Sequence, residues 1–502
     1  MLVSPDTFAF FDLHPDLALR SLRIARLANL VWPLLGTVMV YWLAFRCFGR
    51  RASYVATLLW AFFPLVIGHG VLLPPDLAAA VMVMAVAMMG AMIEPPFFVW
   101  RAAGVGLVLG LAILTKATLV VLFPLLIFWI FFQWRKVIGP WHWREPIREV
   151  IVMSIFSWFA INLGYGWEGC GTRLGDFQFV SSRLDGVAPA VIQPGNIFRE
   201  TLLAHVPIFL PANFVLEIDT QYKGFEINFF YPYLLGRWHR GGFLTFYLWY
   251  FLLKLPVGVL ALVGIGMIGT SFRLVDIKHS SLLFLVTAIG VVLLWFLSWR
   301  TDLNYCRRYR IVCLPSLCLL AAGGSTMFRG PIANKVLWML VLTTVGAGIG
   351  YSPHALSYYN GLVGGPEGGR FSLHGNATDW GQDAIRIGNW CQEHPDRRPL
   401  SVGTVGYLSS LKAYGVEADA VRFEVDSRAS WDDSVRGQKI SAAGWHIVSF
   451  VHLLDPRSPY HAFLYQAPTE SIGWTHLVFY IGAQKAASLS GRSEIELPGE
   501  SL

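Results

Sequence analysis

The chain has 502 residues, of which 55% are hydrophobic and only 14% are charged, and its mean hydropathy is +0.51. This composition is too apolar for a soluble chain of this length and indicates several membrane spans. The formal net charge of +7 does not point to nucleic acid, because most Lys and Arg residues lie in short segments between apolar runs, where they set membrane orientation. The six cysteines include no C-x-x-C pair, so a zinc or redox site is unsupported.

Ten apolar runs follow one another along the chain. Most are close to the roughly 20 residues that a helix needs to cross a hydrocarbon core of about 30 Å. We therefore predict a polytopic α-helical membrane protein with about ten passes, over residues 29–45, 52–69, 77–93, 103–115, 117–133, 149–165, 243–268, 281–298, 309–324 and 336–352.

The stretch 103–132 needs a break. As one helix it would be about 45 Å long, which exceeds the core thickness, and it would hold Lys116 near its middle. Two shortened passes that meet at Lys116 remove both problems.

The loops predict the orientation of these passes. Every second loop is basic, which is the positive-inside pattern. This parity puts the long loop 166–242 and the tail 353–502 outside, and it starts the chain outside, as if an earlier span were missing. The Arg-rich stretch TDLNYCRRYR (301–310) also falls outside, against the rule, and is therefore a candidate site.

The tail has a different character from residues 1–352. Its short apolar segments PLSVGTVG and GWHIVSF read as strands, and SLKAYG reads as a helix end capped by glycine. We predict an extracytoplasmic α/β domain over 353–502 that follows a transmembrane domain over 1–352.

Two candidate residues lie at outer helix ends. Asp76 follows two prolines, where it could simply cap its helix; alternatively, its carboxylate could bind a sugar, a metal or an acceptor. Lys116 could extend to the lipid headgroups, or it could hold a lipid phosphate as a point charge.

Further candidates are cations within or beside apolar runs. Lys254 lies in YFLLKLPVG, where an ionisable side chain is costly and usually faces a partner or an aqueous cavity. Guanidinium groups in the 301–310 stretch match phosphate geometry and its tyrosines can stack on sugars, although a basic rim touching headgroups explains them too. The candidates are Tyr305, Arg307, Arg308, Tyr309 and Arg310 of this stretch, together with Arg300 just before it.

Motifs for other chemistry are missing from the sequence. It contains neither a P-loop nor a dinucleotide-binding glycine motif after a strand, so a soluble nucleotide-sugar donor is unsupported and an ATP-driven pump is disfavoured. No ligand cluster indicates a metal; we expect no cofactor, with a divalent metal left open. The long loop 166–242 is rich in Gly and aromatic residues, which favours a cover over a substrate.

The order of segments resembles a known family. The segments are RCFGRRASYVATLLWAFFPLVIGHGVLLPPDLAAA, GLAILTKATLVVLFPL, YLLGRWHRGGFLTFYLWYFLLKLPVG, NYCRRYRIVCLPSL, YSPHALSYYNGLVGG and TDWGQDAIRIGNWCQEHPDRRPL. This order resembles bacterial glycosyltransferases of the C superfamily, related to dolichyl-phosphate-mannose protein mannosyltransferases and the lipid-A aminoarabinose transferase. The likeness runs over nearly the whole chain, and DWGQD after a YYNGLVGG-like stretch is its most specific part.

The resemblance implies an inverting transfer of a sugar from a polyprenyl-phosphate donor in the cytoplasmic membrane to a protein, lipid or glycan acceptor outside the cytoplasm. It aligns Asp76 with an acidic position in an outer loop and Lys116 with a lysine between two helices. It places Arg308 and Tyr309 near the carrier phosphate. The resemblance also singles out the DWGQD motif, whose role does not follow from the sequence; its residues are Asp379, Trp380, Gln382 and Asp383. Alternatively, Asp379 could simply cap the helix that follows.

The start of the chain departs from this family, which begins with a transmembrane helix and an acidic pair that holds the presumed catalytic base. Asp12 and Asp16 are present here, but FFDLHPDLALR does not look like that pair. Three hypotheses follow. The first is a glycosyltransferase with a carboxylate base and cations that stabilise the departing phosphate. The second is a non-catalytic protein that binds the carrier or a glycan, and the third is a transporter, which would line a path through the bundle with ionisable groups.

Overall fold

The computed structural model describes ten stretches of the chain. They are residues 13–139, 143–186, 194–227, 233–238, 245–299, 311–373, 379–404, 411–423, 443–456 and 458–490.

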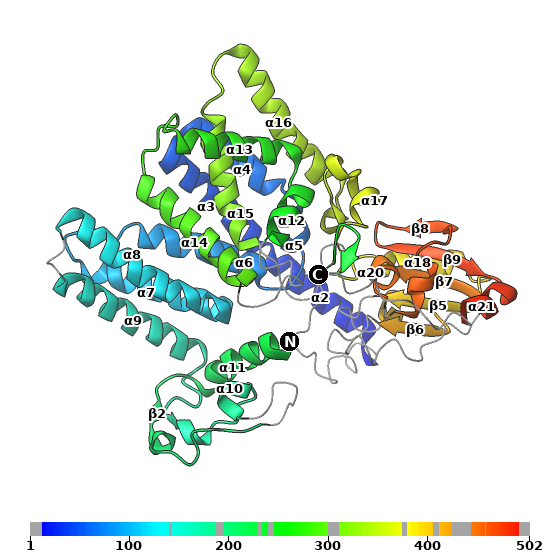
Figure 1. Ribbon diagram of the computed structural model, residues 1–502, viewed down its shortest axis with the longest axis horizontal. Helices are drawn as coiled ribbons and strands as arrows, with labels where there is room; N and C mark the ends of the chain where they lie inside the picture. The colour runs from blue at the N-terminus through cyan, green and yellow to red at the C-terminus, as the bar shows by residue number, and fades with distance from the viewer. Residues whose placement is uncertain are drawn as a thin grey trace.

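Helices form the first third of the chain, and apolar side chains from several of them contribute to one continuous core (Figure 1). In order they are α2 (Pro15–Asn29), α3 (Val31–Phe48), α4 (Arg50–Ala61), α5 (Pro64–Gly70), α6 (Asp76–Gly90), α7 (Val99–Thr115), η1 (Ala117–Val121), α8 (Leu122–Val137) and α9 (Arg144–Gly164).

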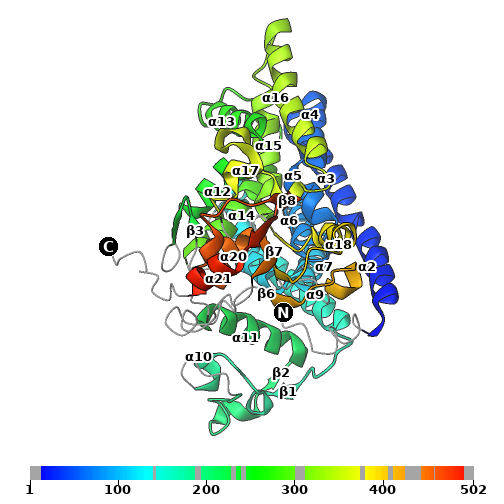
Figure 2. The same cartoon turned by 90° about the vertical axis from the view of Figure 1, so that its right-hand side faces the viewer.

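A small lobe follows α9 and lies at the bottom of the molecule in both ribbon views (Figures 1 and 2). Its longest element is the helix α11, and its short strands β1 and β2 pair antiparallel. The lobe and the hairpin after it comprise β1 (Thr172–Arg173), η2 (Leu174–Asp176), α10 (Ser182–Asp185), η3 (Leu202–His205), β2 (Pro207–Ile208), α11 (Ala212–Ile227), β3 (Tyr233–Leu234) and β4 (Arg237–Trp238).

The chain then returns to the helical bundle. These elements are α12 (Phe246–Lys254), α13 (Val257–Ser271), α14 (Ser280–Trp299), α15 (Leu314–Ser325), α16 (Pro331–Gly350), η5 (Ala355–Ser357), η6 (Gly361–Val363) and α17 (Gly365–Gly369). Small residues let some of these helices approach closely. A Cβ on Gly266 in α13 would lie only 1.9 Å from the carbonyl oxygen of Leu320 in α15, so a larger residue would push the two helices apart.

The described residues contain four helices that are long and apolar enough to cross a membrane, and a fifth if the bent pair α4–α5 forms one span. The four are Pro15–Phe48, Ala117–Val137, Arg144–Gly164 and Pro331–Gly350. Five shorter apolar helices accompany them, the longest of which is α7 with 17 residues. The protein is therefore a multi-pass membrane protein, whereas the expected total of ten passes stays a prediction.

Prolines divide two of the predicted runs. The run 52–69 is two helices, because α4 ends at Ala61 and α5 restarts at Pro64 with a bend of 53°. The run 243–268 is also two helices, since Pro256 has no N–H to continue α12. Each of these predicted runs therefore contains two helices, and whether each run forms one pass stays a prediction. The predicted break at Lys116 is confirmed: α7 ends at Thr115, and Lys116 has the extended φ of −158°.

The tail contains the predicted α/β structure. Its elements are α18 (Ala384–Glu393), β5 (Leu400–Thr404), η7 (Leu411–Tyr414), β6 (Ala420–Phe423), β7 (Gly444–Ser449), α20 (Phe450–Leu454), η8 (Pro459–Phe463), β8 (Glu470–Ile472), β9 (His476–Ile481) and α21 (Ala483–Ser490). The segments PLSVGTVG and GWHIVSF form β5 and β7 as expected, and SLKAYG ends in η7 followed by Gly415 at φ +77°.

The five strands make one mixed sheet in the order β6-β5-β7-β9-β8. The strand β5 runs parallel to β6 and β7, whereas β9 runs antiparallel to both β7 and β8. Side chains of alternating direction fill two apolar clusters. Ile447 packs with Ile387 of α18, and Val448 packs with Phe450 and Phe463. The helix α18 therefore packs on one face of the sheet, and α20 with η8 packs on the opposite face.

The segment between the bundle and the sheet packs on the bundle. Tyr359 and Leu373 are both buried in the bundle core, and η5 contacts α5. Residues just beyond position 352 therefore contribute to the helical core. The division of the chain into two domains at residue 352 stays a prediction.

Candidate functional site

Asp76 and Lys116 form an ion pair. Lys116 Nζ lies 2.5 Å from Asp76 Oδ1, and the carboxylate is buried, with Asp76 only 1% exposed. The side chain of Lys116 keeps 13% of its surface accessible. From the sequence, Asp76 and Lys116 were each predicted to lie at an outer helix end. The fold brings the two residues together.

Helix ends position both side chains. Asp76 is the first residue of α6, where a negative charge complements the helix dipole. The cap position itself is Pro75, so the local-cap interpretation of Asp76 does not match the helix boundary. Lys116 sits in the break between α7 and η1, and this break lets its side chain turn toward α6 instead of lying along a continuous helix.

The turn that leads into Asp76 is held from two sides. Asn29 Nδ2, at the end of α2, donates hydrogen bonds to the carbonyl oxygens of Leu72 at 2.5 Å and Gly70 at 3.2 Å. On the other side, the ring of His69 meets that of Trp380 edge-on, with centroids 6.1 Å apart. The DWGQD segment therefore contacts the turn that positions Asp76.

Lys254 is fully buried at the end of α12. Its Nζ donates a hydrogen bond to the carbonyl oxygen of Leu356 at 3.1 Å and lies 3.7 Å from the centroid of the Tyr359 ring. Both contacts come from the segment that follows α16. The cation predicted to face a partner or a cavity thus joins α12 to that segment.

Asn360 completes this junction. Pro256 has no N–H, so the carbonyl of Leu252 lacks its usual helical donor. Asn360 Nδ2 supplies one at 2.5 Å and also donates to Leu255 O at 2.9 Å. Its backbone N–H donates to Leu253 O at 3.0 Å. The YYNGLVGG stretch thereby closes the end of a helix that proline interrupts.

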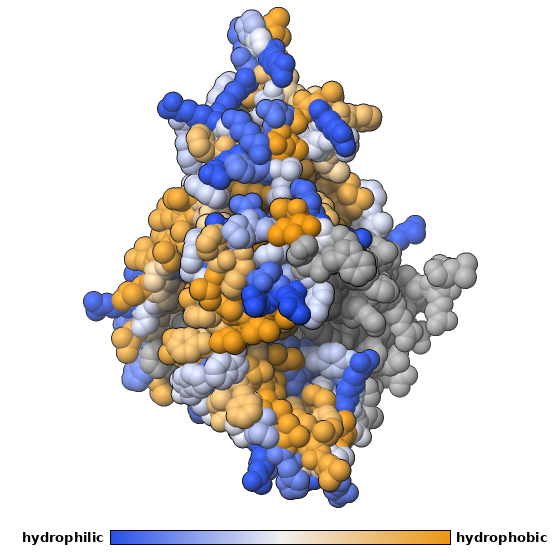
Figure 3. All heavy atoms as spheres, turned by 90° about the vertical axis from the view of Figure 1, so that its left-hand side faces the viewer, coloured by the Kyte–Doolittle hydropathy of each residue, from blue (hydrophilic) through white to orange (hydrophobic). Residues whose placement is uncertain are grey.

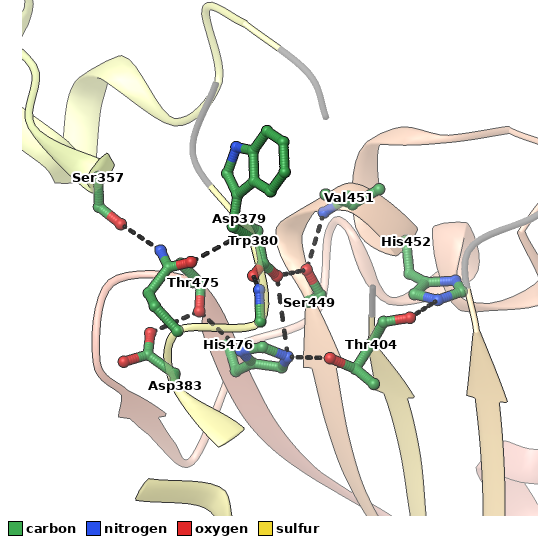
Figure 4. A network of polar contacts seen from close by, with 12 residues as sticks. Ser357, Asp379, Trp380, Asp383, Thr404, Ser449, Val451, His452, Thr475 and His476 are labelled. Atoms are coloured by element: carbon green, nitrogen blue, oxygen red, sulfur yellow. Dashed lines mark hydrogen bonds and ion pairs between the residues drawn. The ribbon is translucent and has the colours of Figure 1, made fainter. Parts of the chain in front are cut away.

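The two acids of the DWGQD segment are fully buried and have different partners (Figure 4). Asp379 accepts hydrogen bonds from Ser449 Oγ at 2.5 Å and from the backbone N–H of Gly381 at 2.8 Å. Asp383 accepts from Thr475 Oγ1 at 2.5 Å and lies 3.2 Å from His354 Nδ1. The helix after the motif begins at Ala384 with Asp383 in the cap position, so the predicted cap by Asp379 was wrong.

His476 lies between the two acids. Its Nδ1 is 2.7 Å from Thr475 Oγ1, and its Nε2 is 3.9 Å from Asp379 Oδ2. Because Thr475 has one hydroxyl proton and gives it to Asp383, its oxygen accepts from His476, which places a proton on Nδ1. A continuous set of hydrogen bonds therefore runs from Asp383 through Thr475 to His476.

These surroundings move the two carboxyl pKa values in opposite directions. Burial raises the pKa of Asp379, and the nearby charge of Asp383 adds to the effect. Burial acts on Asp383 as well, but the hydrogen bonds from His354 and Thr475 and the charge of His476 outweigh it and lower its pKa.

Sequence reasoning missed the partners of this motif. Ser449, Thr475 and His476 come from the ends of β7 and β9, and His354 comes from the segment after α16. Nothing in the local sequence of these residues marks them, because the sheet register brings them to Asp379 and Asp383. The structure explains one neighbouring residue: Gly473 stands at φ +58°, and a Cβ there would lie 2.4 Å from Asp383 Oδ2.

The motif also connects the sheet to the bundle. Gln382 Nε2 donates to Ser357 Oγ at 3.2 Å, and its Oε1 accepts from the N–H of Trp380 at 2.7 Å. In Figure 4 the ring of Trp380 points away from the polar group around His476. The four predicted motif residues therefore have structural partners on both sides of this junction.

The remaining candidates, Arg307, Arg308, Tyr309 and Arg310, lie outside the described residues, as do Arg300 and Tyr305. Within the stretches that the structure describes, no three His, Cys, Asp or Glu residues are placed to hold a metal ion. Among the described residues, Asp76 and Lys116 offer a buried carboxylate and a partly exposed ammonium, which suit the orientation and binding of an anion.

Comparison with known proteins shows a similarity to a family over the first third of the chain. A model described as dolichyl-phosphate-mannose-protein mannosyltransferase matches residues 5–160, a range that contains Asp76 and Lys116. No curated protein matches the chain.

Two solved structures are similar to the chain at low identity. Both are ArnT from Cupriavidus metallidurans, one bound to undecaprenyl phosphate and one in the apo state. Their identities are 16% and 15%, with a TM-score of 0.39 for each. The alignments cover 93% of this chain and 85% and 84% of those chains. The match to the family model is the stronger finding, and it relates the chain, over residues 5–160, to the dolichyl-phosphate-mannose-protein mannosyltransferases.

Proposed function

We propose that this protein is a membrane glycosyltransferase that transfers a sugar from a polyprenyl-phosphate carrier to an acceptor outside the cytoplasm. The observation that carries the proposal is the Asp76–Lys116 ion pair, which lies within the range that matches the mannosyltransferase family. The name of that family describes a donor with a sugar on a lipid phosphate and a protein acceptor.

The reaction needs a cation near the leaving group. The acceptor attacks the anomeric carbon, the bond from that carbon to the carrier phosphate breaks, and the phosphate leaves with the electron pair. A lipid phosphate already carries negative charge, so a nearby ammonium stabilises its departure more than a proton donor would. Lys116 has the right chemistry for this role, because its side chain is partly exposed while Asp76 fixes its position.

Asp76 can act in one of two ways. As a general base it would take the proton of the acceptor; as an orienting group it would hold Lys116 toward the phosphate. Its exposure of only 1% and its contact with Lys116 favour the orienting role in this conformation. A base role needs Lys116 to leave the carboxylate when the donor binds.

The orientation we propose follows from charge. Lys116 precedes the span Ala117–Val137, and Arg135 and Lys136 lie at its other end, which the positive-inside pattern assigns to the cytoplasm. The contact between His69 and Trp380 supports a sheet domain on the same side as the Asp76 turn. We therefore propose the cytoplasmic membrane, with the sheet domain outside.

Polyprenyl-phosphate binding by purified protein tests the role of Lys116. We expect Lys116→Ala to weaken binding about tenfold, which corresponds to the loss of about 1.4 kcal/mol. The matched control is Lys136→Ala, which removes an exposed lysine at the opposite end of the same span. Equal affinities of the two variants would contradict the phosphate assignment. We expect Arg308→Ala to weaken binding as well.

The alternative is a non-catalytic protein that binds the carrier, and the burial of Asp76 beneath Lys116 is the observation that favours it. Transfer from labelled donor in proteoliposomes separates the two. A glycosyltransferase loses turnover in Asp76→Asn while the variant stays folded. A carrier-binding protein shows binding in the wild type without any transfer.

A further inference from the structure

The lobe after α9 exposes an uninterrupted apolar segment. Residues 202–210 read LLAHVPIFL, with His205 as the one ionisable side chain, and the charged pair Arg199 and Glu200 lies just before them. Leu202 is 92% exposed and Phe209 is 63% exposed, and Leu203 and Val206 are exposed too. Figure 3 shows apolar residues reaching from the bundle onto the lower part of this face, where the lobe lies.

The segment is not a loose loop. Ile208 and Pro207 form β2, which pairs with Thr172 and Arg173 of β1. Ala204 packs against Gly175, where an added Cβ would lie 2.8 Å from the Cβ of Ala204. The exposed apolar side chains are therefore presented by a fixed backbone, and their exposure is a property of the fold.

Hydrogen bonds fix the position of this segment along α9. The indole N–H of Trp158 donates to the carbonyl oxygen of Phe209, and Asn162 Nδ2 reaches the same oxygen at 3.5 Å. Trp158 lies six residues before Gly164, the last residue of α9, which is about 9 Å back along the helix axis. Phe209 therefore lies beside the helix and not beyond its end.

The neighbouring surface of α9 is exposed and apolar, as expected of a helix face in contact with lipid. Arg144–Gly164 is a candidate membrane span, and its exposed side chains Ile151, Ile155 and Phe159 recur at a spacing of four residues. Trp167 packs edge-on against Trp158 with centroids 5.2 Å apart, and this pair stands where tryptophans mark the membrane–water interface. Phe209 thus lies beside the same end of α9 as the last residues of this exposed apolar stripe.

We infer that residues 202–209 form a membrane anchor, in which Leu202, Leu203 and Phe209 insert among the acyl chains of the leaflet that surrounds the C-terminal end of α9. The partner is the lipid bilayer itself. The continuity of the segment with a lipid-facing helix surface carries this assignment, since an apolar patch fixed at that level would otherwise face water. It is independent of the transfer reaction and of Asp76.

A fluorescent label at position 202 tests the anchor. We would label Leu202→Cys with an NBD maleimide in a chain that also carries Cys170→Ser and Cys306→Ser. Of the other cysteines, Cys47, Cys313, Cys318 and Cys391 are buried. The protein is reconstituted into vesicles of phosphatidylethanolamine and phosphatidylglycerol, with or without doxyl-labelled lipid. The matched control is Gln221→Cys, an exposed polar position on α11 of the same lobe.

We expect blue-shifted emission at position 202 and a strong loss of fluorescence with doxyl lipid, with little loss at position 221. Quenching of position 202 by aqueous iodide as efficient as at position 221 would overturn the proposal. Protection from iodide without quenching by doxyl lipid would overturn it as well, because it would mean that a protein surface covers the segment. Substitution of so exposed a residue leaves the fold intact, so both outcomes are measurable.

Discussion

The ring of Trp380 meets the ring of His69 edge-on, with centroids 6.1 Å apart. This contact joins the motif that precedes the C-terminal sheet to the turn that leads into Asp76. Both residues are almost fully buried, so the contact belongs to the interior of the protein. The sheet domain and the candidate site are therefore coupled through packing, and changes in one are expected to reach the other.

Removal of the Trp380 side chain tests this coupling. We expect Trp380→Ala to destabilise the protein by about 3 kcal/mol or more, because the truncation of a buried aromatic side chain leaves a cavity. Trp380→Phe keeps an edge-to-face ring pair and should lose much less. Thermal denaturation in detergent, followed by size-exclusion chromatography, measures both variants. Equal losses in the two would show that the ring contact does not matter.

Asn360 offers a test of the junction between α12 and the segment after α16. We expect Asn360→Asp to lower the free energy of unfolding by about 1–3 kcal/mol, because the carboxylate cannot donate to Leu252 O and Leu255 O and brings a charge against them. The same substitution at the exposed Asn389 of α18 is the control. Chemical denaturation of both variants measures the difference. A loss at Asn389 as large as at Asn360 would contradict the assignment.

The sequence predicts those parts of the fold that depend on local interactions, and it does not predict those that depend on contacts between distant segments. The break at Lys116 was predictable, because helix length and a mid-span charge are local properties. The strands β5 and β7 were predictable from their short apolar segments. The partners of Asp379 and Asp383 were not, since His354, Ser449 and His476 reach the motif only through tertiary packing. Local sequence suggested a cap for Asp379, and burial within the sheet domain determined its role instead.

The ion pair illustrates the same limit at the candidate site. The sequence placed Asp76 and Lys116 at the outer ends of different helices, each with its own function. Their separation of 2.5 Å depends on how α6 and α7 pack, which no periodicity or motif specifies. The arginines of the 301–310 stretch stay predictions from sequence.

Lys254 allows stability and carrier binding to be separated. We expect Lys254→Met to destabilise the protein by about 1–3 kcal/mol, because it leaves the buried carbonyl of Leu356 without this donor and removes the contact with Tyr359. Carrier affinity should stay unchanged, since Lys254 is fully buried. The control is Lys335→Met, an exposed lysine on α16. Weaker carrier binding with unchanged thermal stability would instead support a direct role of Lys254 in binding the donor.

The two acids of the DWGQD segment should respond to pH in opposite ways when each is replaced by asparagine. The folded-state pKa of Asp383 lies below its unfolded value, so its ionised form contributes stability that is present above about pH 4 and is lost as the pH falls through the folded pKa. The folded-state pKa of Asp379 is raised, so the contribution of this one group to stability is most favourable below about pH 4 and is lost as the pH rises through the folded pKa. Relative to the wild type, Asp383→Asn should therefore lose more stability at pH 7 than at about pH 2, where the wild-type carboxylate is protonated as well. The free energy of unfolding of Asp379→Asn should rise relative to that of the wild type as the pH rises, because asparagine avoids the cost of a buried charge. Thermal melting of the three proteins between about pH 2 and pH 7 measures both trends, with the second variant as the matched control for the first. Parallel trends in the two variants would show that Asp379 and Asp383 do not differ in their ionisation, and would refute the opposite roles that their hydrogen bonds assign to them.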